Sequence, residues 1–476
     1  MLNSFPSLEK AYDVDAFKEQ GHLLVDLLAS QLSKTKAGKG RVKPDATPEH
    51  LYETLDLSKT PADFKELTEL IISQSTTLHH PGFGGHQVVP PAPLAVLGDF
   101  LSAYLNNGMA VYEMGPAANA MEKVVMDWLC KKLGYGASAE GIFTSGGSLG
   151  NITALLAARQ VMVKDSWNAG TADKQLAVMV SEEAHYSVAR AVKIMGFGEG
   201  GVIPIPTVKH KINPKALKET LEKAKADGKH VFAVVGNACS TSLGVYDDLN
   251  ALADFCESEN LWFHIDGAHG APAAFSKEFS YLTSGIDRAD SLVIDFHKMM
   301  LTPALTTGVV FAKGGDSYAT FAQKAAYLLN PDGHEWYNSG NRTVECTKKM
   351  MAAKVYLMLK LLGEDVFEEY VTRQYQLARL FAQKVKAHDC FELGMEPESN
   401  IVCFRFKTRD SVKDWSNINS QIRDMLMDKG DFYIVQTLIG ESLYLRTTLM
   451  SPFTTENHLD AMLGQLKTIG ESLVSA

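Results

Sequence analysis

The chain has 476 residues, 46% hydrophobic and 21% charged, which is an ordinary composition for a globular protein. One hydrophobic core rarely serves so long a chain, so two or three structural units are expected. The formal net charge of −10 argues against a nucleic-acid partner, because the phosphate backbone would be repelled.

The cysteines and the hydropathy pattern indicate the cellular compartment of the protein. The six cysteines include no CxxC pair, which argues against a zinc site, and their sparse use is typical of free thiols in a reducing compartment. The chain becomes charged soon after its first residue and shows no signal peptide. It has no apolar run of about 18 residues or more, the length of a membrane span. We therefore expect a cytoplasmic protein with no membrane partner.

The first 85 residues are predicted to form a helical segment. Residues 13–33 show helical spacing of apolar side chains such as Leu24 and Leu28, with Asp15 as the expected N-cap. The segment is short and amphipathic for an independent domain. We therefore expect residues 1–85 to pack on another surface, which could be that of a second subunit.

Residues 86–364 alternate between apolar, β-branched runs and helical patterns. This alternation predicts a large α/β domain with a mostly parallel central sheet. Residues 365–476 combine long helical patterns with short strands and predict a small C-terminal α+β domain. The expected strands of the large domain are residues 176–180, 201–205, 231–235, 261–265 and 291–294, and those of the small domain are residues 401–406 and 442–446.

Asp266 ends one of the predicted strands and is followed by two small residues, Gly267 and Ala268. In open α/β sheets, ligands bind beyond the carboxyl ends of the strands. A buried carboxylate at that edge needs a partner, and a protonated heteroaromatic nitrogen would suit it. For this residue alone, a cap on the following turn is the simpler interpretation.

Lys298 follows the next predicted strand, within the run Asp295-Phe296-His297-Lys298. A single lysine is usually a surface residue whose stem covers apolar neighbours. A lysine held near apolar groups can instead act as an amine nucleophile. Two strands that deliver Asp266 and Lys298 to one edge match the needs of pyridoxal phosphate (PLP), which requires a lysine for covalent attachment and an acid for its ring nitrogen.

Two further motifs fit that cofactor. The run Gly146-Gly147-Ser148 precedes a helical pattern, and glycines let a backbone approach a phosphate at a helix N-terminus. The run lacks the GK[ST] ending of a Walker loop, and a glycine-rich turn alone is weak support. His185 follows another strand and could stack on an aromatic cofactor, although a lone histidine there is more often structural.

These motifs, in this order, resemble the group II PLP-dependent amino-acid decarboxylases, a family that includes glutamate, cysteine sulfinate, aromatic and 2,4-diaminobutyrate decarboxylases. Each motif is weak singly, and the order and spacing together are specific. The resemblance covers nearly the whole chain. Its motifs are Asp15-Ala16-Phe17, His80-Pro81, Met121-Glu122, Asp127-Trp128-Leu129, Gly146-Gly147-Ser148, His185-Tyr186-Ser187, Asp266-Gly267-Ala268, His297-Lys298-Met299 and Leu445-Arg446-Thr447-Thr448.

The resemblance implies a fold type I PLP enzyme, similar to the aspartate aminotransferases, that forms a homodimer. It implies that Lys298 holds PLP, that Asp266 faces the pyridine nitrogen and that His185 stacks on the ring. It also implies a substrate-binding role for His86 and for Arg446, whose planar fork suits a carboxylate. The remaining cofactor contacts that it implies are Gly147, Ser148, Ser240, Thr241, Ala268, Asp295 and His297.

The sequence departs from the family at three relevant places, one of which is His269, where a larger aromatic side chain is common. Members usually have a tyrosine on a mobile loop that helps to protonate Cα, and here that position falls near His334. Either His334 or the displaced Tyr337 could serve. Asp295 stands where many members have asparagine beside the phosphate, which is unfavourable unless its carboxylate is hydrogen-bonded or turned away.

The expected reaction is removal of the α-carboxylate of a small L-amino acid to give an amine. The polar stretch from Asn106 to Pro116 and the triplet after Ala184 favour an acidic substrate, namely glutamate, aspartate or cysteine sulfinate. The tail that begins at Thr447 is closer to the diaminobutyrate branch. A 2,4-diaminobutyrate or aromatic substrate is therefore an alternative, as is aldehyde-forming oxidative decarboxylation, which the missing loop tyrosine suggests.

Overall fold

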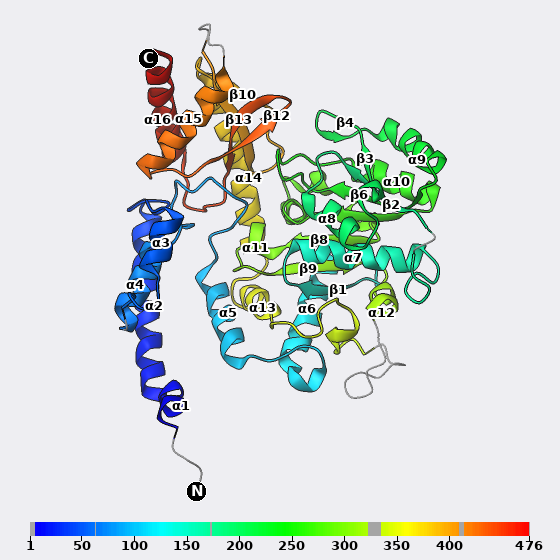
Figure 1. Cartoon of the computed structure of the whole chain (residues 1–476), viewed down its shortest axis with the longest axis horizontal. Coiled ribbons are helices and arrows are strands. Elements are labelled where there is room, and N and C mark those ends of the chain that lie inside the picture. The colour runs from blue at the N-terminus through cyan, green and yellow to red at the C-terminus, as the bar shows by residue number, and fades with distance from the viewer. Residues whose placement is uncertain (1–4, 62, 172–173, 322–334, 409–413, 476) are drawn as a thin grey trace. The chain divides into compact units, whose positions relative to one another are not determined.

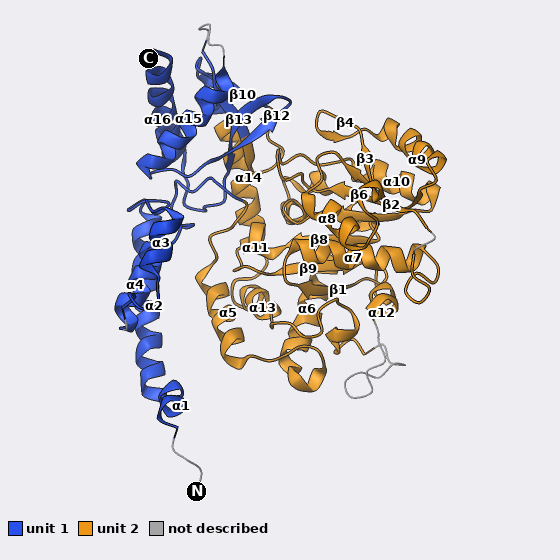
Figure 2. Cartoon of the chain, in the orientation of Figure 1, with its two compact units in different colours: residues 1–86, 383–394, 403–476 blue, residues 87–382, 395–402 orange. Residues whose placement is uncertain are grey.

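The computed structural model describes residues 5–61, 63–171, 174–321, 335–408 and 414–475 (Figure 1). Contacts between residues divide the chain into two compact units, which Figure 2 distinguishes by colour. Unit 1 consists of residues 1–86, 383–394 and 403–476, and unit 2 of residues 87–382 and 395–402. None of the helices in the described ranges is both long and apolar enough to cross a bilayer.

Unit 2 is built on a seven-stranded sheet with the order β1-β9-β8-β7-β6-β2-β3. The five strands from β8 to β3 are parallel, whereas β9 runs antiparallel to both β8 and β1. The strands are β1 (Glu140–Thr144), β2 (Leu176–Ser181), β3 (Val202–Ile205), β6 (His230–Asn237), β7 (Trp262–Asp266), β8 (Ser291–Asp295) and β9 (Thr307–Phe311). A short hairpin, formed by β4 (Thr207–Val208) and β5 (Lys211–Ile212), follows β3 in the sequence.

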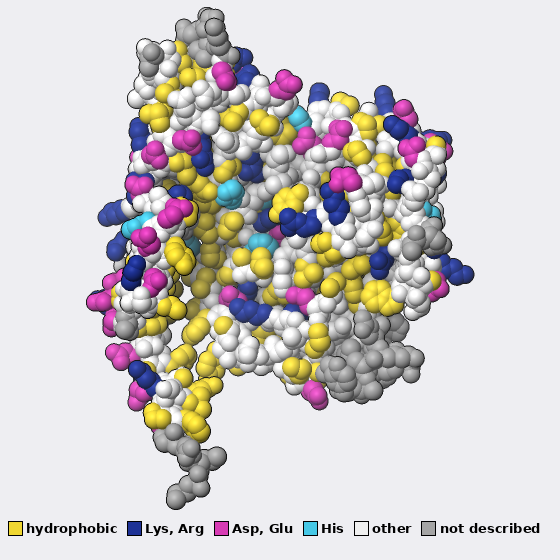
Figure 3. Space-filling model, viewed as in Figure 1, with side chains coloured by type: hydrophobic (Ala, Val, Ile, Leu, Met, Phe, Trp, Pro, Cys, Tyr) yellow, Lys and Arg dark blue, Asp and Glu magenta, His cyan; other side chains and the backbone are white. Residues whose placement is uncertain are grey.

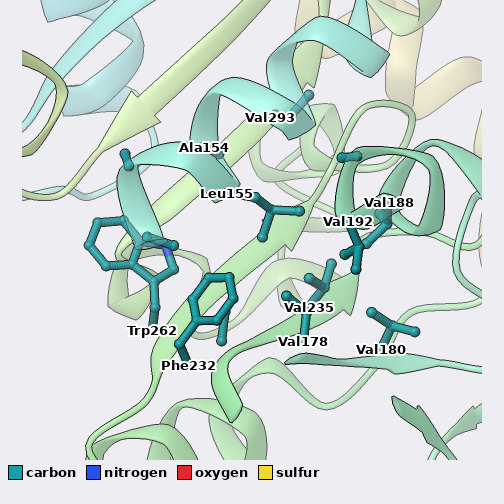
Figure 4. Packing of buried hydrophobic residues seen from close by; sticks show 14 of the residues in the cluster. Ala154, Leu155, Val178, Val180, Val188, Val192, Phe232, Val235, Trp262 and Val293 are labelled. Atoms are coloured by element: carbon teal, nitrogen blue, oxygen red, sulfur yellow. The ribbon is translucent and has the colours of Figure 1, made fainter. Parts of the chain in front are cut away.

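The central strands are buried along their whole length, as expected of parallel strands that helices cover on both faces. Helix α7 packs across β6, β7, β8 and β9, and α8 packs on α7. Figure 4 shows Leu155 of α7 and Val192 of α8 close to Val178 and Val235 of the sheet. The helices of unit 2 are α5 (Pro93–Leu105), α6 (Pro116–Lys132), α7 (Gly147–Met162), α8 (Tyr186–Ile194), α9 (Leu217–Ala226), α10 (Leu249–Glu259), α11 (Phe296–Met299), α12 (Gly315–Phe321) and α13 (Ala352–Leu362).

Unit 1 combines the N-terminal helices with a four-stranded sheet of order β10-β11-β13-β12. Its long helix α2 begins after Asp13, whose carboxylate accepts a hydrogen bond from the Ala16 N–H at 2.9 Å. The helices are α1 (Pro6–Ala11), α2 (Val14–Lys36), α3 (Pro48–Thr54), α4 (Phe64–Ser73), α15 (Trp415–Lys429) and α16 (Glu456–Ser475), and α14 (Asp365–Ala387) extends from unit 2 into unit 1. The strands are β10 (Phe391–Leu393), β11 (Ile401–Phe406), β12 (Val435–Ile439) and β13 (Ser442–Thr448).

The predicted strands are present within one or two residues of their expected bounds. The prediction of Asp15 as the N-cap of the first long helix is wrong. Asp13 caps that helix, because its side chain reaches the N–H three residues ahead, and Asp15 lies in the first turn. Strands β1 and β9 were not predicted, and they give the sheet its antiparallel part. The division at residues 85 and 364 stays a prediction.

Candidate active site

The predicted cofactor residues of unit 2 gather at one edge of the seven-stranded sheet. Asp266 is the last residue of β7, and Asp295 is the last residue of β8. The two strands are parallel neighbours, with Asp266 in register with Val293, so both end at the same edge. Lys298 lies in α11, directly after β8. His185 follows β2, and Ser240 follows β6, the strands that continue this edge.

The Lys298 amine contacts the carboxylate of Asp295. Its Nζ lies 3.0 Å from Asp295 Oδ2, and Thr307 of β9 donates a hydrogen bond to the other carboxylate oxygen. Burial acts to lower the pKa of Lys298, but the carboxylates of Asp295 and Asp266 outweigh it and raise that pKa above its usual value. Asp295 is therefore hydrogen-bonded and paired, the condition under which its departure from the family pattern is tolerable.

Asp266 is held by a network of buried donors. Its Oδ2 accepts a hydrogen bond from Asn151 Nδ2 at 2.9 Å, and its Oδ1 accepts one from the Ala268 N–H at 3.2 Å. Asn151 Oδ1 lies 3.0 Å from His264 Nε2. Burial lowers the pKa of His264 to about 4, so its imidazole is neutral near pH 7. Since Asn151 Oδ1 can only accept, His264 carries its proton on Nε2, and this N–H donates a hydrogen bond to Asn151.

The same network reaches His185. The second hydrogen of the Asn151 amide is donated to Ser187 Oγ at 3.0 Å, and Ser187 Oγ lies 2.7 Å from His185 Nδ1. The Ser187 N–H also points at Nδ1, so that nitrogen accepts and Ser187 donates. Burial lowers the pKa of His185, although the Asp266 carboxylate partly opposes this shift. Asp266 and His185 are thus oriented by a single amide.

Helix α7 begins where the glycine-rich run predicts an anion site. Gly146, the N-cap, has a φ of 105°, a left-handed conformation that favours glycine. The first N–H groups of a helix have no intrahelical partner, and they suit an anion. A Cβ atom added at Gly147 would lie 3.1 Å from Asp295 Oδ2, so the backbone and this carboxylate approach closely at the start of the helix.

The other predicted contacts of unit 2 lie in the loops after β6 and β7 and in helix α11, at the same edge. Ser240 is buried, and its Oγ accepts a hydrogen bond from the Val245 N–H at 3.3 Å, which closes the loop after β6. Thr241 is the next residue of that loop. Ala268 is buried directly after β7. His297 lies in α11, with its Nε2 3.6 Å from Asp295 Oδ2. Their roles in cofactor binding stay predictions.

The two predicted substrate residues belong to unit 1. Arg446 lies on β13, where it is buried, and pairs in register with Val435 of β12. Partial burial and the positive charges of Arg446 and Arg423 lower the pKa of His86. These two guanidinium groups therefore produce a region of positive potential within unit 1, beside an imidazole that is neutral at pH 7. The Asp424 carboxylate, 2.9 Å from Arg423 Nη1, offsets part of this potential.

Two residues are the predicted candidates for protonation of Cα, His334 and Tyr337. His334 lies outside the described residues. Tyr337 belongs to unit 2 and packs edge-on against Tyr112, with ring centroids 5.5 Å apart. Its part in protonation stays a prediction.

Sequence reasoning missed Asn151 and His264. A signal was available for both residues. Successive side chains of a strand point to opposite faces, so His264 and Asp266, two apart on β7, share one face. Asn151 follows the glycine-rich run by one helical turn, and so it lies at the same end of the sheet. A buried amide and imidazole on the face of a predicted ligand carboxylate are typical of groups that orient it.

The chain matches the family model described as the pyridoxal-dependent decarboxylase conserved domain over residues 48–407. It belongs to the pyridoxal-dependent decarboxylase family. An aromatic-L-amino-acid decarboxylase of Bacillus atrophaeus is 30% identical, over 96% of each chain. An L-2,4-diaminobutyrate decarboxylase of Acinetobacter baumannii is 27% identical, over 87% of this chain and 84% of its own. Mouse CSAD, a cysteine sulfinic acid decarboxylase, has a similar crystal structure, with a TM-score of 0.89 at 25% identity over 96% of this chain and 99% of its own.

As a member of this family, the chain is a PLP-dependent amino-acid carboxy-lyase with the fold type I architecture. The residues present fit the cofactor. The start of α7 offers N–H groups to a phosphate, Asp266 is held as a hydrogen-bond acceptor for a protonated ring nitrogen, and Lys298 offers an amine to an aldehyde. Bound PLP supplies an electron sink for the bond that breaks on decarboxylation.

Proposed function

We propose that this decarboxylase acts on a small acidic L-amino acid, namely glutamate, aspartate or cysteine sulfinate. The supporting observation is the positive region of unit 1 that Arg446 and Arg423 form beside His86. A guanidinium group binds a carboxylate or sulfinate through two parallel hydrogen bonds, which a neutral aromatic side chain cannot accept. We assign Arg446 and His86 to substrate binding.

The polar loop after α5 gives less support to this choice than its composition suggests. Asn106 ends α5 in a left-handed conformation, with a φ of 45°. The side-chain amide of Asn107 donates a hydrogen bond to the Leu105 carbonyl at 3.0 Å. Both asparagines thus have local roles in ending the helix. The acidic proposal therefore rests on the positive region of unit 1.

We assign the chemistry to unit 2. Lys298 is the covalent attachment point, Asp266 keeps the ring nitrogen protonated, and His185 stacks on the ring. Asn151 orients both Asp266 and His185, which limits their movement during the reaction. The protein then has to hold the scissile bond perpendicular to the ring and to return a proton to Cα, for which His334 and Tyr337 are the candidates.

An assay of CO₂ release from a panel of L-amino acids tests the substrate. We expect turnover of glutamate, aspartate or cysteine sulfinate, and an Arg446→Lys variant with a KM raised about tenfold or more, since an ammonium cannot reproduce the bidentate geometry. An aromatic substrate is the second candidate, because the relative that is 30% identical has that activity. Turnover of tyrosine, or of 2,4-diaminobutyrate, without turnover of any acidic substrate would refute the proposal. Peroxide and aldehyde in place of amine would indicate the oxidative reaction.

We also propose that the chain forms a homodimer through its N-terminal helices and that it is cytoplasmic. Hydrophobic side chains are exposed on α1 and α2, among them Leu8, Phe17 and Val25 (Figure 3). Exposed apolar rows of this kind mark interaction surfaces. Light scattering should give the mass of a dimer, and a Leu8→Glu/Phe17→Glu variant should shift it toward the monomer. A wild-type monomer at micromolar concentration would exclude this assembly. The absence of a disulfide bond among the six cysteines, all of which lie in the described ranges, supports the proposed cytoplasmic location.

A further inference from the structure

Asp295 lies between the cofactor lysine and the predicted phosphate site. It ends β8, its side chain is 2% exposed, and its Oδ2 lies 3.0 Å from the Lys298 amine. Thr307, on the neighbouring strand β9, holds the other carboxylate oxygen by a hydrogen bond. The carboxylate therefore cannot turn away from Lys298 without losing a buried hydrogen bond.

His297 lies on the same side of the carboxylate. Its Nδ1 lies 3.1 Å from the Thr306 nitrogen and 3.0 Å from the Thr306 carbonyl oxygen, and its Nε2 lies 3.6 Å from Asp295 Oδ2. The other groups whose charges act on Lys298 come from three elements. They are Asp266 at the end of β7, Cys239 in the loop after β6 and His185 at the start of α8.

Both groups of the pair depart from their usual pKa in the direction that favours charge. Burial alone would raise the pKa of Asp295, but Lys298, His297 and Thr307 lower it below the usual value. The carboxylates of Asp295 and Asp266 likewise raise the pKa of Lys298 above its usual value. An amine in this environment stays protonated at neutral pH, and a protonated amine cannot attack an aldehyde.

We propose that Asp295 is a positioning residue that keeps the Lys298 amine as an ammonium whenever that amine is not bonded to the cofactor. This inference rests on the proposed role of Lys298 as the attachment point of PLP. Capture of the cofactor then requires the ammonium to release a proton to solvent. The neutral amine adds to the aldehyde carbon, the carbonyl oxygen leaves as water, and a carbon–nitrogen double bond forms.

The pairing also has a consequence for the phosphate. Asp295 Oδ2 approaches the start of α7, and an unpaired carboxylate there would oppose a second anion. The Lys298 ammonium neutralises this charge until the cofactor is bonded. Exchange of the lysine for a substrate amine would release a neutral amine, which would take up a proton from solvent and pair again with Asp295, so the freed lysine has a defined resting position during each turnover.

The test uses the full chain without cofactor and pyridoxal, which has the reactive aldehyde but no phosphate. Trapping with cyanoborohydride and peptide mass spectrometry give the rate at which Lys298 is modified. Asp295→Asn keeps the shape and the acceptor for Thr307 but removes the charge. An opposite charge at this distance shifts a pKa by about 1–3 units, so the variant should react roughly 10-fold to 1000-fold faster at pH 7. Asp290→Asn, at the other end of β8, is the matched control and should react as the wild type does.

Equal rates for Asp295→Asn and the wild type would overturn the proposal. A second measurement needs no variant. Wild-type modification should rise about tenfold per pH unit from pH 7 to about 9.5, because the amine is still charged there. A plateau that begins below about pH 9 would contradict the proposal. If PLP itself modifies other lysines but never Lys298, the assignment of Lys298 fails, and the inference fails with it.

Discussion

The amide of Asn151 provides the sharpest test of how the site is organised. Its two hydrogens are donated to Asp266 and Ser187, and its oxygen accepts from His264, all at 2.9–3.0 Å. Asn151→Asp keeps the shape and the acceptor for His264. It replaces the donor to Asp266 by a carboxyl oxygen about 2.9 Å from another carboxyl oxygen.

The two buried carboxyl groups of this variant cannot both be ionised, so the folded protein retains a proton that the unfolded chain releases near pH 4. A group whose pKa is raised by folding contributes stability at low pH and loses it as pH rises through the folded pKa. The loss is at most about 1.4 kcal/mol per pH unit, so the variant should lose about 3 kcal/mol more than the wild type between pH 5.5 and pH 8.

Thermal unfolding of the cofactor-free chain, followed by circular dichroism at both pH values, measures this difference. The matched control is the double variant Asn151→Asp/Asp266→Asn, which exchanges the two groups and restores one donor and one acceptor. Its midpoint should depend on pH as the wild-type midpoint does. The reasoning is refuted if Asn151→Asp is destabilised equally at pH 5.5 and pH 8, since no retained proton would then separate the two conditions.

Three further predictions follow from single contacts. Lys298→Ala leaves the Asp295 carboxylate buried without its ammonium partner and should cost about 3–5 kcal/mol of unfolding free energy at pH 8 in urea unfolding. Burial then favours the protonated form of Asp295, so the cost should fall as the pH is lowered. Addition of Asp295→Asn should restore most of the lost stability, and no recovery would contradict the pairing. Glu122→Gln breaks the buried ion pair between Glu122 of α6 and Lys348, whose Nζ also donates a hydrogen bond to the carbonyl of Phe143 in β1. The variant should cost about 3 kcal/mol by the same assay, whereas an unchanged midpoint would show that the pair is dispensable. His185→Phe should bind PLP more tightly than His185→Ala in a titration of the visible absorbance band, because a flat ring can still stack; equal affinities would exclude stacking.

The order of motifs along the chain was sufficient to predict the family and the cofactor, and the pattern of apolar residues was sufficient to predict the alternation of strands and helices. Local chemistry explains this success. Buried parallel strands read as apolar runs, and a ligand residue at a strand end interrupts such a run with a polar side chain, as at Asp266 and Lys298. The sequence alone therefore predicted which residues reach the edge of the sheet.

Only the tertiary structure decided which groups satisfy one another there. Asn151, His264 and Asp266 lie on two elements up to 115 positions apart, and hydrogen bonds between them depend on the packing of α7 across the sheet. The same holds for Asp295, whose partner Thr307 lies on a strand that the apolar pattern did not predict. The sequence can indicate that a buried polar side chain requires a hydrogen-bond partner. The fold determines which residue that partner is, because hydrogen bonds require contact in space and not nearness in sequence.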